Sequence, residues 1–302
     1  MNGHKLVAVD WGTTSLRGAL IAPNGEVMVE RNLDRGILSV AAGDFQSVFE
    51  NAFGDWMTSD TLCLISGMAG SQQGWREAPY CACPAGFSDI AARLEWLEPG
   101  RIAIVPGLSI NSHGIPDVMR GEETQIIGAL LLLGLADARM VLPGTHSKWV
   151  TVASGRITDF STWMTGEFYA MLRQHSILVR TMPAGDPPAD MAAFGQGVNR
   201  ALTGPGLLHT AFSARTLSLF KRLTPEALPS YLSGLIIGEE LKSQNLQRGD
   251  SVAVVGVEAL TVRYEQALAQ LGVTVQRVGA SATWEGLRAI AGAIAEQPPA
   301  KL

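Results

Sequence analysis

One short pattern occurs twice in this chain, once at the start of each half. A strand leads into a loop rich in glycine and hydroxyl side chains, and a second strand and a turn follow. The first copy starts at residue 6 with its loop at 10–15, and the second starts at residue 140 with its loop at 143–148. Apolar runs predict the strands, and Gly, Pro and Asn mark the turns. A pattern repeated in two halves predicts a duplicated α/β architecture.

Each half continues with helices and further strands, and no long linker separates the halves. At about 150 residues per domain, the length of the chain predicts two domains. We place them at residues 1–136 and 137–302, with a cleft between them. Predicted helices span residues 45–56, 122–135, 167–172, 207–222, 229–244, 260–271 and 284–296. The last of these helices is a candidate to pack back on the first half.

Composition excludes several classes of protein. Hydrophobic residues make up 47% of the chain and charged residues 17%, which is the opposite of a disordered composition. A net charge of −5 without a run of Lys or Arg disfavours nucleic acid as a partner. The longest apolar stretch, residues 126–136, is far shorter than the ~20 residues that cross a bilayer. The N-terminus has no signal-peptide pattern, so no membrane partner is expected either.

The three cysteines indicate the cellular compartment of the chain but no functional site. Cys63, Cys81 and Cys83 cannot all pair, and none lies in the CxxC spacing of a zinc site. We therefore assign them no function and expect the chain to work in a reducing cytoplasm.

The two repeated loops carry the chemistry. Hydroxyl and backbone N–H groups between two strands suit phosphate oxygens, and Gly12 and Gly144 permit a close backbone approach. Asp10, at the carboxyl end of the first strand, is placed to hold Mg²⁺. Either loop alone is also compatible with an ordinary hairpin turn, whereas the matched pair favours phosphate binding.

Gly256 follows an apolar strand and precedes a helix, a place where a flat base could stack. An ordinary turn is an equally open interpretation of that single glycine. Neither a GxxxxGK[ST] nucleotide loop nor a GxGxxG dinucleotide fingerprint occurs in the chain. A bound nucleotide would therefore be held by the two hairpin loops.

These features together resemble the actin, hexokinase and heat-shock-70 superfamily of ATP-dependent phosphotransferases. The resemblance spans the whole chain and implies the actin-like ATPase fold, in which two duplicated ribonuclease-H-like domains hold ATP. Several longer blocks look like the signature of the 2-dehydro-3-deoxygalactonokinase family. These blocks are residues 67–75, 78–80, 143–150, 164–167 and 174–178.

The resemblance implies transfer of the γ-phosphate of ATP to the 6-hydroxyl group of 2-dehydro-3-deoxy-D-galactonate, with ATP and Mg²⁺ as cofactors. The implied cofactor-binding residues are Asp10 (also the metal ligand), Gly12, Thr13, Thr14, Ser15, Arg17, Gly144, Thr145, His146, Ser147, Lys148 and Gly256. A substrate with a carboxylate and a keto group needs cationic or N–H donors. Candidates for this role are Ser71, Gly74, Trp75, Arg76, Arg120 and Lys148. Trp75 is equally compatible with plain core packing.

The general base is left open among Glu122, Glu123 and Asp10. Glu122 is preferred, with Glu123 next, because both open a predicted helix where sugar kinases of the superfamily carry an acidic residue. Acidic residues in a first helical turn are also stabilised by the helix dipole without any catalytic role. The stretch Gly121-Glu122-Glu123 further resembles exopolyphosphatases, so a phosphohydrolase remains an alternative, as does a non-catalytic ATP-binding sensor. Whether the chain forms a homodimer is open.

Overall fold

The computed structural model describes residues 4–112 and 114–296, which form two compact units. Unit 1 comprises the described residues up to Ala138, the segment Val150–Phe160 and the residues from Ala280 onward. Unit 2 comprises Arg139–Trp149 and Ser161–Gly279. Unit 2 lies wholly within the second half of the sequence, whereas unit 1 also takes segments from that half, so the division at residue 136 and the cleft stay predictions.

Unit 1 is built on a six-stranded sheet of order β3-β2-β1-β4-β7-β6. Its strands are β1 (Lys5–Trp11), β2 (Leu16–Ile21), β3 (Val27–Leu33), β4 (Thr61–Gly67), β6 (Glu95–Glu98) and β7 (Ile102–Ile104). Strand β1 is antiparallel to β2 and parallel to β4. Most of β1 is buried, as expected of a central strand that is covered on both faces.

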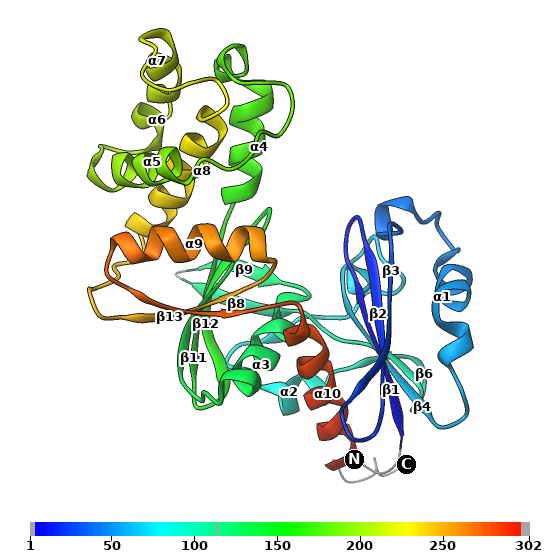
Figure 1. The fold of residues 1–302 in the computed structure, drawn as a ribbon. Helices are drawn as coiled ribbons and strands as arrows, with labels where there is room; N and C mark the ends of the chain where they lie inside the picture. Colours follow the sequence, from blue (N-terminus) through cyan, green and yellow to red (C-terminus); the bar gives the residue numbers. More distant parts are fainter. Residues whose placement is uncertain (1–3, 113, 297–302) are drawn as a thin grey trace. The chain divides into compact units, whose positions relative to one another are not determined.

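Helices cover both faces of this sheet (Figure 1). Helix α1 (Phe45–Phe53) packs on the face that presents Val7, Val9 and Trp11. Helix α10 (Ser281–Glu296) contacts β1, β4 and α3 (Glu122–Leu133). A separate three-stranded sheet and a short helix, which the sequence did not predict, complete the unit: β5 (Cys81–Ala82), β8 (Leu108–Ser112), β9 (Ile115–Met119) and α2 (Phe87–Ala91).

A second sheet has five strands in the order β12-β11-β10-β13-β14. Its strands are β10 (Ala138–Leu142), β11 (Ser147–Ala153), β12 (Arg156–Trp163), β13 (Ser251–Val255) and β14 (Thr274–Val278). The segment Val150–Phe160, which covers much of β11 and β12, is counted with unit 1, and β13 and β14 belong to unit 2. Counted along the chain, the order of third, second, first and fourth strand in β12-β11-β10-β13 is also that of β3-β2-β1-β4. The duplication predicted from the two loops is therefore confirmed.

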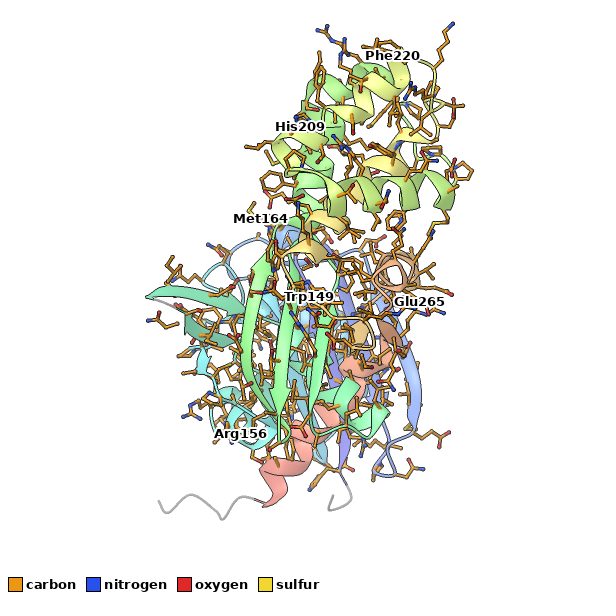
Figure 2. All side chains as sticks on the ribbon, turned by 90° about the vertical axis from the view of Figure 1, so that its left-hand side faces the viewer. Trp149, Arg156, Met164, His209, Phe220 and Glu265 are labelled. Carbon is orange, nitrogen blue, oxygen red and sulfur yellow. The ribbon has the colours of Figure 1, made fainter. Side chains whose placement is uncertain are left out.

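Helix α9 packs on β13 and β14, and a group of helices extends beyond one end of this sheet (Figure 1). Helix α9 spans Glu258–Gln270. The group of helices consists of α4 (Thr165–His175), α5 (Met191–Thr203), α6 (Leu207–Thr210), α7 (Ser213–Leu219) and α8 (Leu228–Lys242). Figure 2 shows Met164 where the sheet gives way to α4, with Trp149 further along the sheet. No helix among residues 4–112 and 114–296 is long and apolar enough to cross a membrane.

The single helix predicted over 207–222 is wrong, because the structure divides it into α6 and α7. The Ser213 hydroxyl donates to the Thr210 carbonyl at 2.5 Å, and the Thr210 hydroxyl donates to the Gly206 carbonyl at 3.2 Å. Such side-chain bonds compete with the regular helical ladder. Helix α5 has no counterpart in the sequence prediction.

Candidate active site

Asp10 lies at the edge where β1 and β4 end together. It is the last residue but one of β1 and is opposite Ser66 of β4. On its other side its cross-strand partner is Arg17 of β2, and the two side chains form an ion pair. The Asp10 side chain is 16% exposed, so this carboxylate can still be reached from solvent.

Two glycines bring the start of α3 against this edge. Gly67, at the end of β4, has φ +92°, and Gly121, just before α3, has φ +104°, a region that favours glycine. A Cβ on Gly121 would lie 3.2 Å from the Gly67 Cα, and a Cβ on Gly67 would lie 3.2 Å from Asp10 Oδ1. The Asp10 carboxylate and the N-terminus of α3 therefore adjoin the same short stretch of backbone.

Glu123 is fully buried in the first turn of α3. Its Oε2 accepts a hydrogen bond from the Gly121 N–H at 2.7 Å, and its Oε1 accepts a long one from the Ser66 hydroxyl at 3.5 Å. Burial, and secondarily the charge of Glu122, raises the pKa of Glu123 to about 8. Glu123 therefore carries its proton at neutral pH and fastens the helix start to β4.

Glu122 differs from its neighbour because it is only half-buried. Its Oε2 accepts a hydrogen bond from the Arg120 backbone N–H at 3.0 Å, which closes the turn before α3. Of the two acidic residues that the sequence could not separate, Glu122 is the one that solvent or a ligand can reach.

The Arg120 guanidinium contacts neighbouring residues, but two of its nitrogens donate no hydrogen bond. Its Nη2 donates to the Ala78 carbonyl at 2.8 Å, and its guanidinium carbon lies 4.4 Å from the centre of the Tyr80 ring. Its Nε and Nη1, and the Ser71 hydroxyl, are buried without a hydrogen-bond partner. Gly70 leaves room for Nη1, since a Cβ there would lie 2.7 Å away. Unpaired buried donors of this kind call for an acceptor that a ligand could supply.

Other predicted substrate residues lie apart from Asp10. Trp75 packs with Trp11, at 6.1 Å between ring centres, and belongs to the core beneath α1. Since Asp10 and Trp11 are consecutive in a strand, their side chains face opposite sides of the sheet. Arg76 pairs with Glu95 at 3.6 Å, and Gly74 fits under the Ala69 carbonyl.

The first predicted phosphate loop, residues 10–15, comprises the last two residues of β1 and the connection 12–15 to β2. The Gly12 N–H donates to the Ser15 carbonyl at 2.9 Å, which closes the loop. The carbonyls of Gly12 and Thr13 accept from the N–H groups of Ile37 and Leu38 at 3.0 and 3.3 Å. Thr13 and Thr14 are exposed, so their hydroxyls are available at the surface of the loop.

The second predicted phosphate loop, residues 143–148, comprises the connection 143–146 between β10 and β11 and the first two residues of β11. The connection packs against the N-terminus of α4. A Cβ on Gly166 would lie 2.5 Å from the Gly144 carbonyl oxygen. The Glu167 N–H donates to the Thr145 carbonyl at 3.0 Å, and the His146 ring nitrogen lies 2.5 Å from the Glu167 carboxylate. Thr145 and His146 are exposed. An exposed loop beside a helix N-terminus is suited to anions.

Ser147 and Lys148 are predicted cofactor residues that the structure places inside the unit. The Lys148 ammonium is largely buried and donates to the Thr162 hydroxyl at 2.7 Å. The Ser147 hydroxyl donates to the buried carboxylate of Glu240 at 2.7 Å. Glu240 was missed by the sequence analysis. Its one signal is that it lies, beside Glu239, between the apolar residues 235–237 and Leu241 of a predicted helix.

Gly256 lies beside the second loop. It has φ +150°, and a Cβ there would lie 3.8 Å from the Pro143 carbonyl oxygen. A crevice of about 60 Å³ adjoins the same loop. It is lined by Pro143, Gly144, Thr165, Gly166, Tyr169, Ser233, Ile236, Ile237, Leu260, Arg263 and Tyr264. Its mostly apolar lining suits the flat part of a nucleoside.

The donor set at Asp10 fits Mg²⁺. This ion takes one or two carboxylates, and waters and phosphate oxygens complete its shell. No group of three His, Cys, Asp or Glu side chains that could hold a metal occurs within 4–112 and 114–296. A single carboxylate beside a hydroxyl-bearing loop therefore fits an ion that arrives with a phosphorylated ligand.

Two sheets that share the order of their first four strands, each with a glycine and hydroxyl loop after its first strand, define an α/β protein of the actin-like ATPase class. A solved structure with this fold is an activator of 2-hydroxyisocaproyl-CoA dehydratase from Clostridium difficile with bound ADPNP. It is 12% identical, with a TM-score of 0.52, and covers 99% of this chain and 98% of its own. At this identity the likeness concerns the fold alone.

Sequence comparison narrows the class to one family. The 2-keto-3-deoxy-galactonokinase family model matches residues 10–290. The 2-dehydro-3-deoxygalactonokinase of Escherichia coli K12 is 36% identical over 96% of this chain and 99% of its own. A Sinorhizobium meliloti protein provisionally given that name has a crystal structure with a TM-score of 0.88, at 36% identity over 96% of this chain and 99% of its own. The chain belongs to the 2-keto-3-deoxy-galactonokinase family.

Proposed function

We propose that this chain transfers the γ-phosphoryl group of ATP to the 6-hydroxyl group of 2-dehydro-3-deoxy-D-galactonate. The observation that carries this proposal is the meeting of the Asp10 carboxylate and the N-terminus of α3 at Gly67. Phosphoryl transfer to a hydroxyl group requires a carboxylate that binds the metal ion and an accessible acidic side chain. Asp10 and the start of α3 supply these two groups. The names of the relatives support the choice of the sugar acid.

ATP when bound supplies the phosphoryl group, and Mg²⁺ neutralises charge on its phosphates. Asp10 would hold this ion, and Arg17 fixes the orientation of the Asp10 carboxylate through their ion pair. The exposed hydroxyls of Thr13 and Thr14 donate to phosphate oxygens.

In unit 2, the loop 143–146 and the N-terminus of α4 bind phosphate oxygens, and His146 adds a donor at the surface. Ser147 and Lys148 act from inside, because their side chains hold the strand that follows the loop. The nucleoside lies toward Gly256 and the adjoining crevice, whose side chains move apart to admit a purine.

Glu122 is the proposed general base. It is reachable, and its carboxylate can accept the proton of the attacking hydroxyl group. Glu123 is unsuited to this step, because it is buried and already protonated at neutral pH. Its role is to hold the first turn of α3, and therefore Glu122, in place.

Arg120 and Ser71 bind the carboxylate of the sugar acid. The unpaired N–H groups on Nε and Nη1 of Arg120 are charged donors for carboxylate oxygens, and the Ser71 hydroxyl adds a further donor. These donors are buried, so the residues that cover them must move aside for the ligand.

The test is a coupled ADP-release assay with ATP, Mg²⁺ and 2-dehydro-3-deoxy-D-galactonate. We expect turnover with wild type, a loss of about 100-fold or more in kcat for Asp10→Asn and Glu122→Gln, and little change for Glu123→Gln. The control is Glu98→Gln, which removes an exposed carboxylate that pairs with Arg101. Phosphate release at the same rate without a sugar acid would contradict the kinase and favour a phosphohydrolase.

We place this activity in the cytoplasm. Cys63, Cys81 and Cys83 are free thiols, and thiols stay reduced in that compartment, where ATP is also available.

A further inference from the structure

Glu240 is a carboxylate in the interior of unit 2, and its partners come from three other elements. Its Oε1 accepts a hydrogen bond from the Trp149 indole N–H at 2.6 Å. Its Oε2 accepts from the hydroxyls of Ser147 at 2.7 Å, Tyr264 at 2.9 Å, and Thr165. Glu240 itself is 2% exposed on α8. One side chain therefore ties α8 to β11, α4 and α9.

Two of these partners flank the connection 143–146 of the second phosphate loop. Ser147 is the first residue of β11, directly after this connection, and Thr165 is the first residue of α4. The next residue of α4, Gly166, packs on Gly144 so closely that a Cβ would lie 2.5 Å from the Gly144 carbonyl oxygen. The loop and the helix start thus touch each other, and Glu240 holds both from the interior.

Four donors converge on this carboxylate, three on Oε2 and one on Oε1. Burial raises the pKa of Glu240, while the hydrogen bonds from its four partners act in the opposite direction. A hydrogen-bonded polar network in a low-dielectric interior fixes the positions of its members.

We propose that Glu240 is a positioning residue for phosphate binding. Its carboxylate fixes loop 143–146 against the N-terminus of α4, so that both present their donors to one anion. Glu240 does not touch the nucleotide and acts through Ser147 and Thr165. This inference rests on the proposed kinase function in one respect: that function identifies the anion as the phosphates of ATP.

The first test measures the protein without ligand. Glu240→Gln keeps the shape of the side chain but turns one acceptor into a donor that faces hydroxyl or indole donors. We expect amide hydrogen exchange in peptides covering 143–147 and 165–168 to become about 10-fold faster, with exchange in unit 1 unchanged. Glu239→Gln, the neighbouring change on the same helix, should leave both peptides as in wild type. Equal exchange in wild type and Glu240→Gln would overturn the proposal.

The second test separates phosphate binding from nucleoside binding by calorimetry. We expect Glu240→Gln to weaken binding of a non-hydrolysable ATP analogue about 10-fold and to leave adenosine within about 2-fold. Thr165→Val should weaken the analogue, Thr165→Ser should not, and Thr165→Val should add little on top of Glu240→Gln. Equal loss for adenosine and the analogue, or additive losses, would refute the positioning role.

The two Thr165 variants keep this test decisive if Glu240→Gln fails to fold. If Thr165→Val bound the ATP analogue as tightly as wild type does, the proposal would also be refuted. Failure of the kinase function gives a different result. Wild type would then bind the ATP analogue without turning over the sugar acid, while the exchange measurement would still report on Glu240.

Discussion

Replacing Glu123 with glutamine removes a buried carboxyl group whose ionisation lowers the stability of the fold as the pH rises. Burial raises the pKa of Glu123 from 4.5 to about 8 in the folded protein, whereas an unfolded chain keeps the ordinary value. The folded protein therefore retains a proton that the unfolded chain releases. Its contribution to stability is fully present below about pH 4.5 and is lost as the pH rises through about 8. Between about pH 5 and 9 this linkage amounts to about 4 kcal/mol.

The assay is urea unfolding of wild type and Glu123→Gln at a series of pH values across this range, followed by tryptophan fluorescence. Other titrating groups contribute equally to both proteins, so their difference isolates position 123. Glutamine keeps an acceptor for the Gly121 N–H and stays neutral. We expect the stability of the variant relative to wild type to increase by about 4 kcal/mol from about pH 5 to pH 9.

Glu122→Gln is the matched control at the neighbouring position. The charge of Glu122 is the second cause of the raised pKa of Glu123, so its removal should lower that pKa and make the pH dependence shallower without abolishing it. A difference between wild type and Glu123→Gln that stays constant from about pH 5 to pH 9 would refute the claim that Glu123 is buried as a neutral acid.

Gly128→Ala should lower the free energy of unfolding by about 1–3 kcal/mol in urea titrations, because its Cβ would lie 1.8 Å from the Ala282 carbonyl oxygen of α10; an unchanged midpoint would argue against this helix crossing. Gly70→Ala should raise KM for the sugar acid about 10-fold and leave KM for ATP unchanged, because the new methyl group displaces Arg120. Equal changes in both KM values would contradict a carboxylate site there. Burial raises the pKa of Cys83 to about 11, so thiol reagents at neutral pH should label it slowly in the native protein and rapidly in urea.

The sequence predicted the parts of the fold that local patterns specify. The two hairpins and their loops were recognisable because short apolar runs lie between turn residues, and their repetition implied a duplicated architecture. The three-stranded sheet was missed because β5 has two residues and pairs with β8, about 25 residues later. Helix α5 was missed because Gly197 weakens its helical signal. The glycine is nevertheless needed there, since a Cβ would lie 2.1 Å from the Tyr231 carbonyl oxygen.

The candidate site could be predicted as a set of residues but not as a set of roles. Glu122 and Glu123 are the same residue type at consecutive positions, and only the packing of α3 decides which one is buried. Trp75 and Ser147 lie in stretches typical of the family, yet one packs under α1 and the other faces Glu240. Side-chain direction in these loops follows from tertiary contacts, which spacing along the chain does not encode.

Glu123 and Glu240 show how the number of donors sets the role of a buried carboxyl group. Glu123 receives a short hydrogen bond from Gly121 and a long one from Ser66, and it lies beside a second acid, so burial dominates and the neutral form is favoured at pH 7. Glu240 receives four donors. Each donor removed from Glu240 should therefore raise its pKa further and bring it closer to the state of Glu123. A neutral Glu240 would hold its hydroxyl partners less firmly, so Tyr264→Phe should loosen the second phosphate loop although Tyr264 lies on a different helix.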